Sequence, residues 1–254
     1  MIPKLAHTIW MQGADKIPAD YKSNLLETQK LNPDWKILIW DRNSIREELK
    51  KLGDKYLQKF DSFHILHQKV DFARYALIYI HGGLSIDADA KAIKPFSEIP
   101  YIDEKNFIVG YSNMDKVSTA VHGYENRTIN NSVIIASPRH PVLKDVLDHI
   151  LTLDCRPSDS DFSCVIFTTG QSFNEVLYKH KNEITILPNE YFEACHSSDS
   201  GCELPPTAII EHRHAQTWVP KTHQLAAKAY FFIKQYWFFI LFLIVILFLA
   251  LRKK

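Results

Sequence analysis

The sequence has no excess of charge of either sign, no internal repeat and no low-complexity tract. Its 254 residues include 30 Lys and Arg against 29 Asp and Glu, for a net charge of +1. So balanced a chain exerts no general electrostatic attraction on a polyanion, and we do not expect a nucleic-acid partner. Its length suits one α/β domain with a sizeable core and a short appendage.

Cysteine is scarce, and its spacing excludes the usual zinc sites. The sequence has four, Cys155, Cys164, Cys195 and Cys202, with no Cys-x-x-Cys pair among them. Structural zinc sites need closely spaced ligand pairs, which are missing here. We interpret the cysteines as ordinary thiols, and a disulfide between Cys195 and Cys202 stays open if that segment is luminal.

Charged residues are also missing from the stretch Tyr236–Leu251, which reads YWFFILFLIVILFLAL. Counted from Tyr230, with Lys234 snorkelling to the interface, this segment reaches the roughly 20 residues that a membrane-spanning helix needs. Aromatic residues gather at its start, as in an interfacial belt. We predict a globular domain over residues 1–225 and a membrane anchor over residues 226–254, with the transmembrane helix at about 232–251.

The sequence leaves open which side of the membrane the domain faces. Met1–Trp10 lacks a basic leader followed by a long apolar run, so we predict no cleavable signal peptide, which favours a cytosolic domain. The basic residues 252–254 and the sequons Asn126-Arg-Thr128 and Asn130-Asn-Ser132 favour a luminal one. We expect a single-pass protein of a Golgi, ER or other internal membrane if its source is eukaryotic or viral.

Short apolar runs alternate with amphipathic stretches over the first 110 residues, a pattern typical of β-α-β units. We therefore predict an α/β fold with a mixed, mainly parallel sheet. Strands are predicted at 5–10, 35–40, 84–86, 107–111, 133–136, 184–187 and 208–210, and helices at 43–52, 63–80, 141–151 and 171–180. Asn43 is the predicted N-cap of the first helix, and Gly82 and Gly83 are predicted to end the second.

The residues that favour chemistry lie in Asp71-Phe-Ala-Arg74-Tyr, then Gly82-Gly83, then Asp87-Ala-Asp89. Residues two apart in an extended segment point to the same face, so Asp87 and Asp89 are expected to present two carboxylates just past a strand end. Two such carboxylates repel each other unless a cation is present. Their oxygens suit Mg²⁺ or Mn²⁺, and a diphosphate can complete the coordination.

Asp71 and Arg74 lie three residues apart and so share a face of the preceding helix. Arg74 offers a fork of donors to a sugar hydroxyl or phosphate oxygen, and Asp71 can accept hydrogen bonds from ribose or sugar hydroxyls. Ligands of open α/β sheets bind beyond the carboxyl ends of the strands, where these residues are expected. The alternatives are a surface ion pair for Asp71 and Arg74, and a chance Asp-x-Asp in a loop.

The combination of Asp-x-x-Arg-Tyr, Gly-Gly and Asp-x-Asp resembles glycosyltransferase family 32. That family includes fungal initiating α-1,6-mannosyltransferases and inositol phosphorylceramide mannosyltransferases, and the same spacing occurs in the large clostridial glucosylating toxins. The resemblance covers most of residues 3–220. It implies a GT-A fold, meaning a single Rossmann-like nucleotide-diphospho-sugar transferase domain, and retention of anomeric configuration.

The resemblance also implies roles for residues outside this stretch. Trp10 falls where such enzymes stack an aromatic ring on the nucleotide base, Trp218 would close over the donor, and either His212 or His214 would reach the metal or diphosphate. Ser85 departs from the Tyr usual in members, and Gln171 from the Pro of a Thr-Gly-Pro turn. The predicted catalytic residues are Arg74, Asp87 and Asp89; the donor-binding residues are Trp10, Asp71, Arg74, Asp87, Asn131 and Trp218; and the metal ligands are Asp87, Asp89, His212 and His214.

We expect a retaining transfer, dependent on Mn²⁺ or Mg²⁺, of mannose, galactose or glucose from GDP-mannose or a UDP-hexose. The predicted anchor favours a membrane-associated acceptor, either a glycan, a glycolipid or a glycoprotein. The alternatives are a nucleotide-sugar hydrolase, a catalytically inactive membrane-anchored module that binds glycans or nucleotide sugars, and a structural tail-anchored scaffold. The sequence does not choose among the donors, because selectivity depends on details of the pocket.

Overall fold

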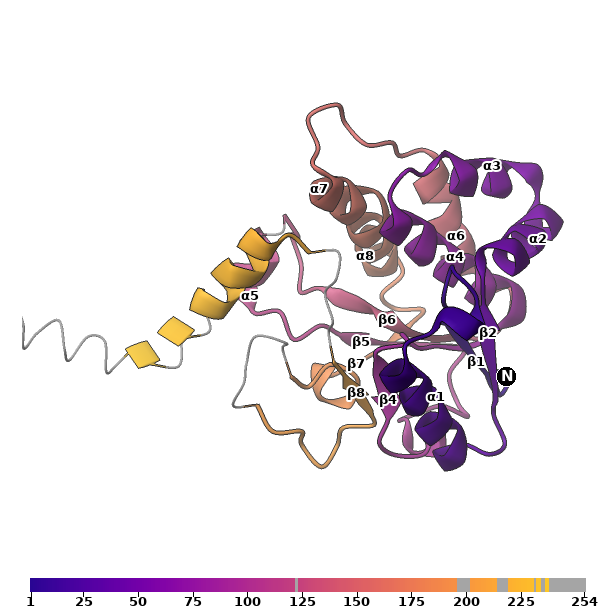
Figure 1. Ribbon diagram of the computed structural model, residues 1–254, viewed down its shortest axis with the longest axis horizontal. Helices are drawn as coiled ribbons and strands as arrows, with labels where there is room; N and C mark the ends of the chain where they lie inside the picture. The colour runs from indigo at the N-terminus through magenta and orange to yellow at the C-terminus, as the bar shows by residue number, and fades with distance from the viewer. Residues whose placement is uncertain (122, 196–201, 214–218, 231, 234–235, 238–254) are drawn as a thin grey trace, which may run out of the picture.

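A six-stranded sheet runs through the molecule in the order β2-β1-β3-β6-β5-β7 (Figure 1). The computed structural model describes residues 1–121, 123–195, 202–213, 219–230, 232–233 and 236–237. The strands are β1 Leu5–Ile9, β2 Lys36–Trp40, β3 Gly83–Ser85, β5 Phe107–Tyr111, β6 Ile129–Ala136 and β7 Thr185–Leu187. Strand β6 runs antiparallel to β3 and β5, whereas β2, β1 and β3 are parallel neighbours and β5 is parallel to β7. The predicted mixed, mainly parallel sheet is confirmed.

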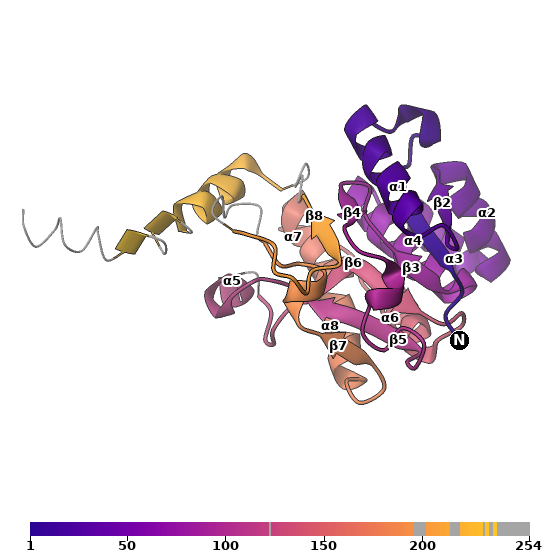
Figure 2. The same cartoon turned by 90° about the horizontal axis from the view of Figure 1, so that it is seen from below.

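The helices are α1 Ala19–Leu31, α2 Arg42–Leu52, α3 Asp54–Ser62, α4 Leu66–His81, α5 Lys116–Val121, α6 Pro141–Leu151, α7 Asp161–Val165 and α8 Ser172–Lys179. A π-helical turn, Ile166–Gln171, joins α7 to α8. A second, two-stranded sheet pairs β4 Ala90–Ala92 with β8 Ile210–His212. Figure 2 shows β8 lying beside β4 next to the main sheet.

Two apolar cores lie on the two faces of the main sheet. Helices α4, α6 and α8 pack on one face, where Tyr75 stacks on Phe173 with ring centroids 4.9 Å apart. Helix α1 and strand β4 cover the other face (Figure 1). There Trp35 packs edge-on against Phe96, with ring centroids 5.0 Å apart. The sheet is therefore covered on both faces, as the near-continuous apolar runs in its strands require.

The two glycines after α4 bring β3 against β1. Gly82 and Gly83 both have a positive φ, of 65° and 96°, which side chains with a Cβ rarely adopt. A Cβ on Gly83 would also lie 2.3 Å from the carbonyl oxygen of Leu5 in β1. The predicted end of the helix at these glycines is confirmed, and their close approach sets where the chain emerges at Asp87.

The predicted cap of α2 was wrong. Asp41, not Asn43, caps this helix: its Oδ1 accepts a hydrogen bond from Ser44 N at 2.8 Å, while Ser44 Oγ accepts one from Asp41 N at 3.0 Å. This reciprocal pair is a capping box, which satisfies two backbone donors at once and is therefore preferred over a single cap. Asn43 lies inside the first turn.

The interpretation of Cys155 and Cys164 as ordinary thiols was wrong, whereas the disulfide between Cys195 and Cys202 that the sequence left open is present. The structure joins Cys155 to Cys164 and Cys195 to Cys202, at sequence separations of 9 and 7 residues. The first pair connects the loop after α6 with α7. Because such pairing depends on how the chain turns back on itself, the spacing in the sequence did not reveal the first pair.

After β8, residues 221–230 form a helix that lies beside α5 and leads away from the sheet (Figures 1 and 2). The hydroxyl of Tyr230 donates to Asp115 Oδ2 at 2.5 Å, which ties this helix to the segment before α5. Within the part of the chain that the structure describes, no helix has the length and apolar character to cross a membrane. The predicted transmembrane helix at about 232–251 lies almost wholly outside the described residues.

A buried histidine in β1 should make stability depend on pH. His7 Nε2 bonds to the Gly82 carbonyl oxygen at 2.9 Å, and its Nδ1 accepts from Trp40 Nε1 at 3.0 Å, so the ring is neutral. Burial lowers the pKa of His7 to about 4. Between pH 6.5 and 4 the unfolded chain binds a proton that the folded chain does not. We expect His7 to remove roughly 3 kcal/mol of stability across this window as the pH falls.

Urea unfolding of the wild type and of His7→Gln over this pH range would measure that contribution. The variant keeps a donor and an acceptor but does not titrate, so its free energy of unfolding should fall less steeply than that of the wild type. Equal slopes would contradict the prediction.

Candidate active site

Asp87 and Asp89 follow β3 at its carboxyl end, in a turn held by neighbouring strands. Ile86 is bonded to β1 through its N–H, which donates to the His7 carbonyl at 3.0 Å, and through its carbonyl, which accepts from Thr8 Oγ1 at 3.0 Å. Ala90 N then donates to the Asp87 carbonyl at 3.0 Å and closes the turn. The expected extended backbone was wrong here, but the turn brings the two carboxylates together as predicted.

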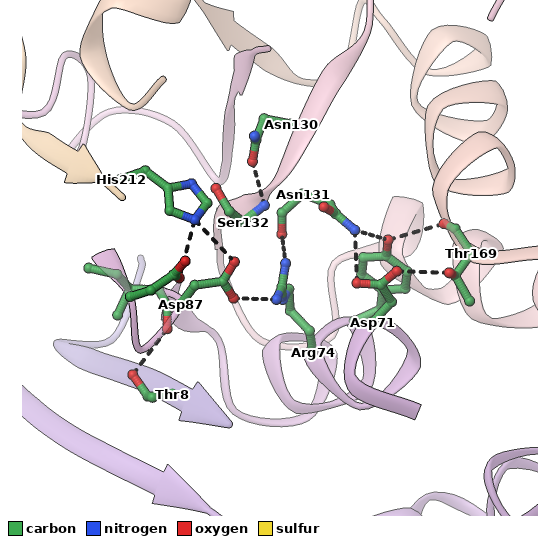
Figure 3. Close-up of polar contacts among 12 residues, drawn as sticks. Thr8, Asp71, Arg74, Asp87, Asn130, Asn131, Ser132, Thr169 and His212 are labelled. Carbon is green, nitrogen blue, oxygen red and sulfur yellow. Dashed lines mark hydrogen bonds and ion pairs between the residues drawn. The ribbon is translucent and has the colours of Figure 1, made fainter. Parts of the chain in front are cut away.

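His212 completes a cluster with these two carboxylates (Figure 3). It lies on β8, directly opposite Ala90 of β4. Its Nε2 lies 3.3 Å from Asp89 Oδ1 and 3.8 Å from Asp87 Oδ2. Of the two candidate histidines the structure therefore brings His212 to the carboxylates, whereas His214 lies outside the described residues.

The donor set of the cluster fits a divalent cation. One ligand atom from each of Asp87, Asp89 and His212 lies within 4.8 Å of the others. Two carboxylates and one imidazole suit Mn²⁺ and leave coordination positions for the oxygens of a diphosphate. Burial would lower the pKa of His212, but Glu193 and the two aspartates raise it well above its ordinary value.

Arg74 joins the cluster to α4 and β6. Its Nη2 donates to Asp87 Oδ1, and its Nη1 donates to the backbone carbonyl of Asn131 (Figure 3). The guanidinium is buried, so its charge acts on Asp87 with little screening by solvent. Burial raises the pKa of Asp87, while Arg74 acts against that rise. Arg74 is thus fixed beside the predicted metal site.

Asp71 faces a different set of partners from Arg74, although both lie on α4. Its carboxylate accepts from Asn131 Nδ2 at 3.1 Å and from Thr169 Oγ1 at 2.8 Å, and Asn131 Nδ2 also donates to the Tyr75 hydroxyl at 2.8 Å. Burial raises the pKa of Asp71, and Arg74 opposes the rise. Asp71, Asn131 and Thr169 form a polar network beside the cluster (Figure 3).

Three residues of the site received no predicted role. Tyr75 and Thr169 stand in motifs that the sequence does show: Tyr75 ends the Asp-x-x-Arg-Tyr motif on α4, and Thr169 begins the Thr-Gly turn. Thr169 reaches Asp71 from the π-helical turn, and such turns recur at functional sites. Glu193, whose Oε1 lies 2.6 Å from His212 Nδ1, follows β7 in an irregular segment and carries no sequence signal.

Two tryptophans, Trp10 and Trp218, were predicted to bind the donor, and the structure describes Trp10. Trp10 follows β1 at the same edge of the sheet as Asp87, and its ring meets Tyr21 edge-on with centroids 5.9 Å apart. Within the described residues Trp10 Nε1 is buried and has no hydrogen-bond partner. Trp218 lies outside the described residues. Their contacts with a nucleotide stay predictions.

The sequence matches a known family model over this site. Residues 18–108 match the family described as the glycosyltransferase sugar-binding region containing a DXD motif. The matched range holds α4, both glycines and the Asp87–Asp89 turn. The segment that supplies His212 lies outside it.

Curated relatives include viral and fungal proteins. An uncharacterized glycosyltransferase of Acanthamoeba polyphaga mimivirus is 29% identical over 91% of this chain and 88% of its own length. Inositol phosphoceramide mannosyltransferase 1 of Schizosaccharomyces pombe is 26% identical over 59% of this chain, and the mannosyl phosphorylinositol ceramide synthase SUR1 of Saccharomyces cerevisiae is 22% identical over 74%. The matches cover only 43% and 45% of these two fungal relatives.

Solved structures share the fold. The PaToxG glycosyltransferase superposes with a TM-score of 0.51 at 17% identity, covering 70% of each chain. Mouse xyloside xylosyltransferase 1 gives a TM-score of 0.51 at 12% identity, covering 87% of this chain and 100% of its own. At these identities the likeness shows the arrangement of helices and strands and does not extend to a substrate.

Proposed function

We propose that this chain, a glycosyltransferase whose residues 18–108 match the sugar-binding region containing a DXD motif, transfers a hexosyl group from a nucleotide diphosphate sugar at the Asp87, Asp89 and His212 cluster. The observation that carries this proposal is the convergence of these three residues, two from the turn after β3 and one from β8, beside Arg74. We propose a GT-A fold for the domain, in line with the glycosyltransferases that share its sheet.

Each residue of the site has a part in this proposal. Asp87, Asp89 and His212 would hold Mn²⁺ or Mg²⁺, which neutralises the diphosphate as it leaves the sugar. Arg74 orients Asp87 and places a fixed positive charge beside the phosphate oxygens. Asp71 is positioned by Asn131 and Thr169 to accept hydrogen bonds from donor hydroxyls.

We propose that transfer retains the anomeric configuration, with the acceptor attacking from the face that the diphosphate leaves. In this arrangement the side chains position the reactants and stabilise developing charge, and no covalent intermediate with the enzyme is formed. The anomeric configuration of the product is the direct test. An inverted product would contradict this part of the proposal.

GDP-mannose is the proposed donor and mannose the transferred sugar, because the two fungal relatives are named for adding mannosyl groups to inositol phosphoceramides. We propose a membrane-associated acceptor, with a glycolipid placed first for the same reason. The apolar run Tyr236–Leu251 supports a membrane location, as do Leu225 and Trp237, which expose 69% and 49% of their surface just before or at its start.

To test the donor and acceptor, the detergent-solubilised full chain would be incubated with Mn²⁺, membrane lipids and, in turn, GDP-mannose, UDP-galactose or UDP-glucose. We expect labelled sugar to enter the lipid fraction from GDP-mannose alone. Transfer from a UDP-hexose instead would overturn the proposed donor and leave the glycosyltransferase activity standing. Transfer only to a protein fraction would overturn the lipid acceptor.

The paired cysteines lead us to propose that the domain faces an oxidising compartment, such as the lumen of the ER or Golgi. For protein isolated from a eukaryotic cell we expect the four cysteines to resist alkylation until a reductant is added. Asn126 is exposed and lies in a sequon, so we also expect a mass lost on glycosidase treatment that is absent in Asn126→Gln. Freely alkylated cysteines and an unchanged mass would contradict this orientation.

A further inference from the structure

Glu193 is a buried carboxylate that the proposed chemistry leaves unused. Its side chain is 2% exposed, and an unpaired charge at such a position would be strongly unfavourable. Its Oε1 lies 2.6 Å from His212 Nδ1 and accepts from Ser132 Oγ at 3.1 Å. These contacts join the segment after β7 to β8 and β6.

The backbone around Glu193 holds this carboxylate in place. Its N–H donates to the Asn189 carbonyl at 2.7 Å, which closes the turn after β7. Two residues further on, Cys195 is joined to Cys202. The turn before Glu193 and the disulfide after it therefore fix the backbone that carries the carboxylate.

The two nitrogens of His212 face opposite partners. Nδ1 faces Glu193, whereas Nε2 faces Asp89 at 3.3 Å and Asp87 at 3.8 Å. A carboxylate only accepts hydrogen bonds, so it requires a proton on Nδ1. A cation held between Nε2 and the two aspartates takes the place of a proton on Nε2. The imidazole then keeps its proton on Nδ1, toward Glu193, and its Nε2 lone pair faces the cation.

We propose that Glu193 is a positioning residue, which holds His212 in the orientation and tautomer that bind a divalent cation through Nε2. The inference rests on the proposed function only in taking the cation to bind at Asp87, Asp89 and His212. Carboxylates behind metal-binding histidines raise the basicity of the imidazole and fix its ring, and their loss typically weakens metal binding by about 10- to 100-fold.

The test measures Mn²⁺ affinity by calorimetry on the full chain in detergent, with no sugar donor present. Glu193→Gln is nearly isosteric and is expected to weaken Mn²⁺ binding by about 10- to 100-fold. Glu211→Gln is the matched control: it neutralises a carboxylate next to His212 on β8 that pairs with Lys91 at 3.3 Å, and its affinity should equal that of the wild type. Unchanged affinity in Glu193→Gln would overturn the proposal.

A double-mutant cycle separates positioning from a merely structural effect. In a His212→Ala background, Glu193→Gln should cause little further loss of Mn²⁺ affinity, because there is no imidazole left to position. An equal loss in both backgrounds would overturn the proposal, since Glu193 would then act by another route. Normal Mn²⁺ affinity in a wild type that transfers no sugar would contradict the proposed function and leave the role of Glu193 intact.

Discussion

Asp89→Asn is expected to lower kcat/KM for sugar transfer by about a thousand-fold or more, because the cluster loses a negatively charged ligand. Asp89 Oδ1 is the carboxylate oxygen nearest to His212 Nε2, at 3.3 Å. An amide oxygen carries no charge to hold the cation against the departing diphosphate. Initial rates with saturating and limiting donor would measure the loss.

Asp15→Asn serves as the control for this variant. Asp15 is an exposed aspartate that pairs with its neighbour Lys16 at 3.5 Å, far along the chain from the cluster. Its rate should equal that of the wild type. If Asp89→Asn stayed within a few-fold of the wild type while thermal unfolding showed both proteins folded, Asp89 would not bind a catalytic cation.

Arg74→Ala is expected to destabilise the fold by about 3 kcal/mol, since it leaves the partly buried carboxylate of Asp87 without its positive partner. Arg74 is 5% exposed and bonds both to Asp87 and to the Asn131 carbonyl. Urea unfolding at pH 7 without metal would measure the change. We expect transfer to fall as well, because Asp87 would lose its fixed orientation.

A second substitution tests the cause of that instability. If the unpaired charge on Asp87 is responsible, Arg74→Ala combined with Asp87→Asn should be more stable than Arg74→Ala alone. A double variant whose two losses simply add would show that Arg74 stabilises the fold through packing or through the Asn131 carbonyl rather than through Asp87.

The part of the site within one short stretch of sequence was predictable. Asp71, Arg74, Asp87 and Asp89 belong to one helix–turn–strand unit, and its geometry follows from helix spacing and from the two glycines. The structure brings Arg74 and both DXD carboxylates together, as that spacing indicated. Asp71 instead bonds to Asn131 and Thr169, since its side chain turns toward the π-helical turn.

The part that depends on distant segments was not predictable. Glu193 reaches His212 only because the segment after β7 passes behind β8, and no local pattern encodes that approach. The sequence analysis did not predict helix α1. Its buried positions include the polar residues Asn24 and Thr28, so its apolar residues do not recur at helical spacing. Asn24 Nδ2 donates to the Ala88 carbonyl at 3.4 Å, so this polar residue on the buried face of α1 contacts the turn that carries Asp87 and Asp89.

The most direct test of the central claim is metal-dependent release of nucleotide diphosphate from a panel of GDP- and UDP-sugars by the full chain. We predict release from one donor with Mn²⁺, its loss on chelation, its return when Mn²⁺ is added back, and no release by the Asp87→Asn, Asp89→Asn double variant. Release that persists in the double variant or in the presence of chelator would contradict the assignment of the cluster. A folded protein that binds Mn²⁺ but releases nothing from any donor would contradict the proposed transfer.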